Sequence, residues 1–242
     1  MSTLETKKIE PLSGTSVTLG AAGDAVTMPA GVTVKTNTVK DAGGNTLWTS
    51  DGSGTLSSVN SGLTGGMIFI SSATASGSAS VEFTSGIDST YDEYVFYLVD
   101  INPSASNPDF GWISSSDGGS SYGIATTTTM FRADHKEDNS AAGLSYRDGR
   151  DAAQSTGNIT LTGNVGNDAD NALVAEFHLY SPSNTSKVKH FTAVAHSMQT
   201  GGGYFYQWHS AGYINTTSAI NAIKWFDSSG NFDGNIYLYG IK

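Results

Sequence analysis

The side chains best suited to metal binding or proton transfer in this sequence are five histidines. No two of them are two to four residues apart, so no compact ligand pair of the kind used by zinc sites is present. The chain also has no cysteine, which excludes thiolate ligands and thiol nucleophiles. The sequence therefore predicts no metal site, and we interpret these residues as ordinary strand or loop histidines: His135, His178, His190, His196 and His209.

Carboxylates come close together in the sequence twice, at Asp88–Glu93 and at Asp134–Asp138. A glycosidase holds two carboxylates at a defined separation across a cleft, and neighbours within one loop are poor candidates for that role. No Gly-x-Ser-x-Gly elbow leads from a strand into a helix, and no glycine-rich loop is followed by the lysine of a phosphate site. The pattern predicts no catalytic residue and no cofactor.

The sharpest candidate for ligand binding is the aromatic run Tyr204–His209. In a strand, Tyr204, Tyr206 and Trp208 would share one face, and the residues that alternate with them would share the other. Exposed aromatic rings stack on sugar rings while short polar side chains fix the orientation of the sugar. The alternative is that one of the two faces is simply core. The predicted receptor-binding residues are Trp112, Tyr122, Tyr206 and Trp208, with Asn107, Asp109, Gln207 and His209 as polar partners.

Two further segments, Phe131–Asp138 and Tyr146–Asp151, concentrate charges of both signs. The sequence predicts that they are solvated loops between strands. The alternative is a contact with another protomer or partner, since loops on rigid β scaffolds often carry specificity.

The elements that must position these residues are short β-strands. Apolar stretches in residues 66–242 alternate with polar residues or run continuously for strand lengths, and turn-rich clusters separate them, which is typical of an antiparallel sandwich or jelly roll. One helical turn or two is expected near Thr216–Ala222. The predicted strands are Gly66–Ile70, Ser80–Phe83, Glu93–Ile101, Phe110–Ile113, Ile159–Leu161, Leu173–Tyr180, Val188–Ala195, Tyr204–Tyr213, Ala222–Phe226 and Gly234–Ile241.

Residues 1–65 have a different composition, with Trp48 as their sole aromatic residue. Very short alternating pieces such as Ser16–Leu19, Ala25–Met28 and Thr46–Trp48 are separated by glycine-containing turns. Their thin apolar faces cannot offset the conformational entropy lost on folding alone. We expect residues 1–65 to form an oligomerising stem, completed by other copies in a closed trimer. The alternative is a disordered tail. The predicted domains are therefore a stem over 1–65 and an all-β head over 66–242.

The net charge of −10 and a pI near 4.7 argue against nucleic-acid partners, which require clustered lysine and arginine. The longest apolar stretches are strand-sized and far shorter than the roughly 20 residues that cross a bilayer as a helix. We therefore expect neither nucleic-acid binding nor membrane insertion.

Several segments resemble virion structural proteins of tailed bacteriophages of marine bacteria. They are Gly23–Val34, Lys40–Gly54, Tyr94–Pro103, Ile113–Gly119 and Gly234–Gly240. The resemblance implies a fibre, spike or other protein on the particle surface, trimeric, with an N-terminal anchoring stem. It supplies no catalytic residues.

The resulting hypothesis is a non-enzymatic virion protein. Its stem would bind other virion proteins, and its head would recognise a host-surface glycan or outer-membrane component. A second hypothesis is a capsid-decorating or head-fibre protein that binds only other virion proteins, and a third is a polysaccharide hydrolase. An exposed aromatic groove would favour attachment, whereas burial of Trp112 and Trp208 would favour decoration.

Overall fold

The computed structural model of the chain describes residues 36–53, 56–57, 59 and 66–242, and it divides into two units, Met1–Leu63 and Thr64–Lys242. The first unit contains a small antiparallel sheet in the order β1-β2-β3. The strand predicted at Thr46–Trp48 is confirmed within β2, whereas the predicted strands before residue 36 lie outside the described residues. The bounds are Thr38–Lys40 for β1, Thr46–Ser50 for β2 and Leu56–Ser57 for β3.

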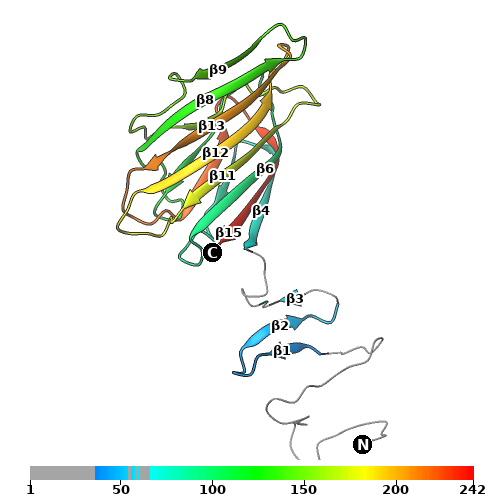
Figure 1. The fold of residues 1–242 in the computed structure, drawn as a ribbon, viewed down its shortest axis with the longest axis vertical. Helices are drawn as coiled ribbons and strands as arrows, with labels where there is room; N and C mark the ends of the chain where they lie inside the picture. The colour runs from blue at the N-terminus through cyan, green and yellow to red at the C-terminus, as the bar shows by residue number, and fades with distance from the viewer. Residues whose placement is uncertain (1–35, 54–55, 58, 60–65) are drawn as a thin grey trace, which may run out of the picture. The chain divides into compact units, whose positions relative to one another are not determined.

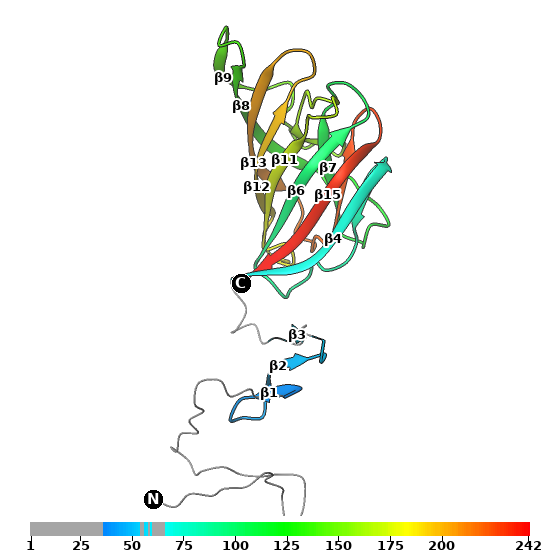
Figure 2. The same ribbon diagram turned by 90° about the vertical axis from the view of Figure 1, so that its right-hand side faces the viewer.

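The second unit, the head, is a β-sandwich of two antiparallel sheets (Figures 1 and 2), which confirms the predicted all-β class. The large sheet has eight strands in the order β4-β15-β6-β11-β12-β13-β8-β9, and the small sheet has four in the order β10-β7-β14-β5. The bounds are Met67–Ser78 (β4), Ser80–Phe83 (β5), Glu93–Pro103 (β6), Phe110–Ser115 (β7), Thr126–Lys136 (β8), Ala142–Tyr146 (β9), Ile159–Thr162 (β10), Leu173–Tyr180 (β11), Lys189–Met198 (β12), Tyr204–Ile214 (β13), Ala222–Asp227 (β14) and Phe232–Ile241 (β15).

The period-two pattern of the strands decides which residues enter the core. Along β11, Leu173, Ala175, Phe177 and Leu179 are buried, and the residues between them are exposed or half-buried. The buried side chains meet those of the small sheet, which covers one face of the large sheet. The centre of the core is a set of rings around Phe177, whose centroid lies 4.9 Å from Trp112, 5.3 Å from Trp225, 5.4 Å from Phe191 and 6.1 Å from Phe96.

Two strands of the large sheet are absent from the sequence prediction. Of the segment Phe131–Asp138, expected to be a loop, residues 131–136 form the second half of β8, and Tyr146 ends β9. The prediction was wrong because β8 carries Arg132 and Asp134 at positions that in other strands are apolar. These positions are tolerated since the two side chains form an ion pair, with 2.9 Å between Arg132 Nη2 and Asp134 Oδ1.

The helical turn predicted at Thr216–Ala222 is also wrong. This segment is an irregular connection between β13 and β14, and its backbone groups bond elsewhere. The carbonyl oxygen of Thr216 accepts a hydrogen bond from Nζ of the buried Lys189 at 3.1 Å, and the backbone N–H of Ile220 donates to Pro182 O at 2.9 Å. The described residues form no helix. They therefore contain no helix that is long and apolar enough to cross a membrane.

Candidate binding surface

The face of the large sheet that points away from the small sheet is exposed over much of its width, and we call it the open face. Antiparallel register aligns its side chains in rows across the strands. One row runs through neighbouring partners from β15 to β9 and is rich in aromatic residues. Its members are Tyr237, Tyr97, Glu176, Val194, His209, Phe131 and Tyr146.

All five histidines of the chain lie on the open face, although four strands supply them. Their register partners are neutral: His196 pairs with Val174 and Gln207, and His209 pairs with Val194 and Phe131. The ring of His209 stacks on that of Phe131, with centroids 4.8 Å apart and planes 8° apart. The histidines therefore belong to one continuous surface, which spacing along the chain does not reveal.

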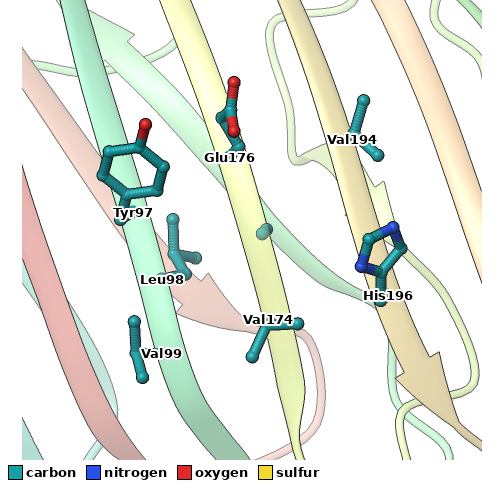
Figure 3. A pocket seen from close by; sticks show the side chains of 8 residues that line it. Tyr97, Leu98, Val99, Val174, Glu176, Val194 and His196 are labelled. Carbon is teal, nitrogen blue, oxygen red and sulfur yellow. The ribbon is translucent and has the colours of Figure 1, made fainter.

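Three shallow hollows lie along the open face. The largest, of about 240 Å³, is bounded by Tyr97, Val174, Glu176 and His196 from β6, β11 and β12, as Figure 3 shows. A second lies over Phe131, Thr192 and His209, and a third over His135, Phe205 and Gln207. The lining mixes flat aromatic rings, aliphatic side chains and a few polar groups, which is the composition expected of a site for a small ligand or a sugar ring.

The open face carries little charge. Because side chains alternate along a strand, the cationic residues in the described strands of the large sheet point to the opposite face. They are Arg132, Lys136 and Lys189. The carboxylates Glu93 and Glu176 both hydrogen-bond the ring of His178, the first at Nδ1 and the second at Nε2. Burial lowers the pKa of His178, but the hydrogen bonds and charges of Glu176 and Glu93 outweigh burial, and the net shift is upward from 6.5. The ring therefore bridges β6 and β11, and its two carboxylate partners favour its protonated form.

This bridge predicts a pH-dependent stability. Because the folded-state pKa lies above 6.5, the protonated ring stabilises the fold fully below that pH, and its contribution falls as the pH rises through the folded-state value. Partial exposure and screening limit the effect to about 1 kcal/mol or less. We expect His178→Gln to flatten the pH dependence of the unfolding free energy as the pH rises above about 6.5. His190→Gln is the matched control, and equal slopes for the two variants would contradict the bridge.

The structure corrects the prediction for three of the four aromatic rings in the proposed site. Trp112 and Trp208 are both 0% exposed, and Tyr206 is 4% exposed. Trp112 lies on the inner side of β7, against Phe177 and Phe191. The faces of Tyr206 and Trp208, expected to stack on sugars, are covered by the guanidinium of Arg132, which lies 4.0 and 5.2 Å from their centroids.

The other predicted residues lie in three separate places. Tyr122 lies over the outer side of the small sheet, where its hydroxyl donates a hydrogen bond to Glu82 at 3.1 Å. Burial is the larger cause and the charge of Glu82 the smaller one that together raise the pKa of Tyr122 to about 12. Asp109 accepts from Arg150 Nε at 3.0 Å, and Asn107 occupies a turn with a φ of 57°. Only Gln207 and His209 lie together on the open face, and each lines a hollow there.

Most residues of the open face are absent from the binding site that the sequence predicted. These include Tyr97, His196 and Phe205, and alternation within each strand would have grouped them once the strand register was known. In the part of the chain that the structure describes, no three histidine, aspartate or glutamate side chains gather as a metal site would require.

No protein-family model, curated protein or solved structure matches this chain. Its function is therefore inferred from the open face and from the residues around it.

Proposed function

We propose that the chain is a non-enzymatic surface protein of a tailed-phage virion, and that its head recognises a glycan on the host surface through the open face. The observation that carries the proposal is the coincidence of three hollows, exposed aromatic rings and hydrogen-bonding side chains on one sheet face. Residues 1–65 would attach the protein to other virion proteins and to two further copies of itself.

Recognition of a neutral sugar fits the chemistry of this face. A sugar presents apolar C–H faces and hydroxyl groups, so it needs rings for stacking and short polar side chains for orientation. Around the largest hollow, Tyr97 supplies a ring and His196 and Glu176 supply polar groups. Single aromatic contacts contribute roughly 0.5–1.5 kcal/mol, so each site would bind weakly. Three copies in a trimer would raise the strength of attachment through effective concentration.

A second candidate function is decoration, in which the head binds only other virion proteins. The burial of Trp112 and Trp208 favours it, because these rings were the strongest single candidates for sugar stacking and they belong to the core. A broad sheet face with few charged residues would also suit a protein–protein interface, whose centre is depleted in charged residues.

Substitution on the open face separates the two functions. We expect Tyr97→Ala with His196→Ala to weaken binding of the isolated head to host cells or to host-surface polysaccharide by about tenfold, from the loss of two contacts. Binding is measured by sedimentation with cells and by glycan array. Tyr122→Ala, on the outer side of the small sheet, is the control and should bind like the unmodified protein.

Two outcomes would oppose glycan recognition. If the double variant binds host cells normally, the open face is not the receptor surface. If the unmodified head binds no host-surface component, but purified particles lacking the protein take it up, decoration is the better account.

A further inference from the structure

Every arginine of the chain lies against one tryptophan. Arg132 is on β8, and Arg147 and Arg150 are in the loop that follows β9. Their guanidinium carbons lie 5.2, 5.9 and 5.6 Å from the centroid of the buried Trp208 ring. We call these three residues the arginine cluster. It is a local concentration of positive charge in a chain whose net charge is −10.

Two of the three guanidinium groups have carboxylate partners. Arg132 lies 2.9 Å from Asp134, and Arg150 lies 2.9 Å from Asp109 and also donates to Asn164 at 3.1 Å. The arginine side chains in these two pairs are 12% and 21% exposed. These two side chains are held in place, because partly buried charges are stable in a protein when they are paired and hydrogen-bonded.

Arg147 differs from the other two. Its backbone N–H donates to Met130 O at 2.9 Å, but in the described part of the chain its guanidinium has no carboxylate or carbonyl partner. The residue is half-buried. Burial lowers its pKa, and the neighbouring charges of Arg132 and Arg150 lower it further. A guanidinium has five N–H donors, so the donors of this group are unused, and the nearby charge of Asp134 raises its pKa by less than Arg132 and Arg150 lower it.

We propose that Arg147, supported by Arg132 and Arg150, binds an oxyanion, which is a carboxylate, sulfate or phosphate group of a ligand. The planar fork of arginine matches two oxygens of such a group and forms charge-assisted hydrogen bonds with them. The two paired arginines, whose charges Asp134 and Asp109 largely balance, provide a rigid support. Gly163 permits the close packing, since a Cβ at that position would lie 2.2 Å from Arg150 Nε.

This site is separate from the open face. Arg132 pairs in register with Trp208, and both point to the inner side of the large sheet, whereas the hollows lie on the outer side. The inference therefore does not depend on glycan recognition by the open face. An acidic sugar, a sulfated sugar and a free inorganic anion share the required chemistry, and the titrants below distinguish them.

The arginine Nε–H groups provide a direct test, because the chain contains only three arginines. In ¹⁵N-labelled full-length protein, we would follow these three signals during titration with sodium sulfate, sodium phosphate, sodium acetate and sodium glucuronate. Sodium chloride at equal ionic strength is the reference. We expect at least one oxyanion to shift the Arg147 signal saturably where chloride does not. Preference for glucuronate over acetate would indicate an acidic sugar, and preference for sulfate or phosphate a tetrahedral group.

Substitutions test the assignment to Arg147. We expect Arg147→Met to weaken oxyanion binding about 10- to 100-fold, the loss expected for a charged hydrogen-bonding group. Arg147→Lys, which keeps the charge but lacks the fork, should bind with intermediate affinity. Lys187→Met removes one positive charge from a distant exposed loop and should bind like the unmodified protein.

Two results would overturn the proposal. One is the absence of any saturable shift in the unmodified protein, which is decisive even if a variant fails to fold. The other is equal oxyanion affinity for Arg147→Met and Lys187→Met.

Discussion

Replacement of Phe177 by alanine is expected to destabilise the head by about 3–5 kcal/mol, the usual cost of removing a buried phenylalanine. Phe177 is fully buried on β11, and its ring contacts those of Phe96, Trp112, Phe191 and Trp225, which belong to both sheets. The cavity would therefore open at the junction of the sandwich, where no single neighbour can fill it.

The effect is large in comparison with the total stability of a typical domain, about 5–15 kcal/mol. For a domain of this size it corresponds to a fall in Tm of about 6–20 °C, measurable by calorimetry. Phe205→Ala is the matched control, because Phe205 is 46% exposed on the open face and its loss should change stability by less than about 0.5 kcal/mol. A similar Tm for both variants would show that the rings do not form a common core.

The second large effect is expected at Gly212 of β13. This residue pairs with Thr128 of β8 and Phe191 of β12, and a Cβ there would lie 2.1 Å from Thr127 O and 3.0 Å from the Phe191 ring. The nearest atom belongs to the backbone, so β8 itself would have to move. We expect Gly212→Ala to cost about 3 kcal/mol, at the upper end of overpacking effects.

Denaturant unfolding measures this cost directly. Gly157→Ala serves as the control, because a Cβ there meets Ser155 Oγ at an ordinary contact distance of 3.7 Å and the residue has no left-handed φ. If both alanine variants unfold at the same denaturant concentration, β8 and β13 are not as close as the structure has them.

The alternation of apolar residues was sufficient to predict most of the head strands, including β5 and β11 with their observed bounds. It failed for β8 and β9 because their sequences lack that signal. Thr126–Thr129 is a run of four threonines, and Arg132 and Asp134 satisfy each other at positions where a core strand would carry apolar residues. This segment is a strand because it pairs with β13, which is far away in the sequence. Local sequence patterns cannot predict such a long-range pairing.

The candidate site was only partly predictable for a related reason. Alternation separates Tyr206 and Trp208 from Gln207 and His209, but it does not say which pair faces the core. The position of the arginines decides this, since Arg132, Arg147 and Arg150 cover the aromatic pair from segments far away in the chain. The histidines of the open face likewise come together only through register between four strands.

The order of strands in the large sheet has a consequence for how the protein folds during synthesis. The last strand, β15, lies between β4, the first strand of the head, and β6. Contacts across this junction span most of the head, as between Thr74 Oγ1 and Asn235 Oδ1, 2.8 Å apart and 161 residues apart in sequence. Until Phe232–Ile241 has emerged from the ribosome, β4 has no partner and β6 presents an unpaired edge.

Such non-local pairing slows folding, because loop-closure entropy is lost before the contacts form. The nascent head therefore passes through a stage in which an incomplete sheet with apolar side chains is exposed to other chains. Protection by chaperones, or rapid assembly, is therefore most important before β15 has paired with β4 and β6.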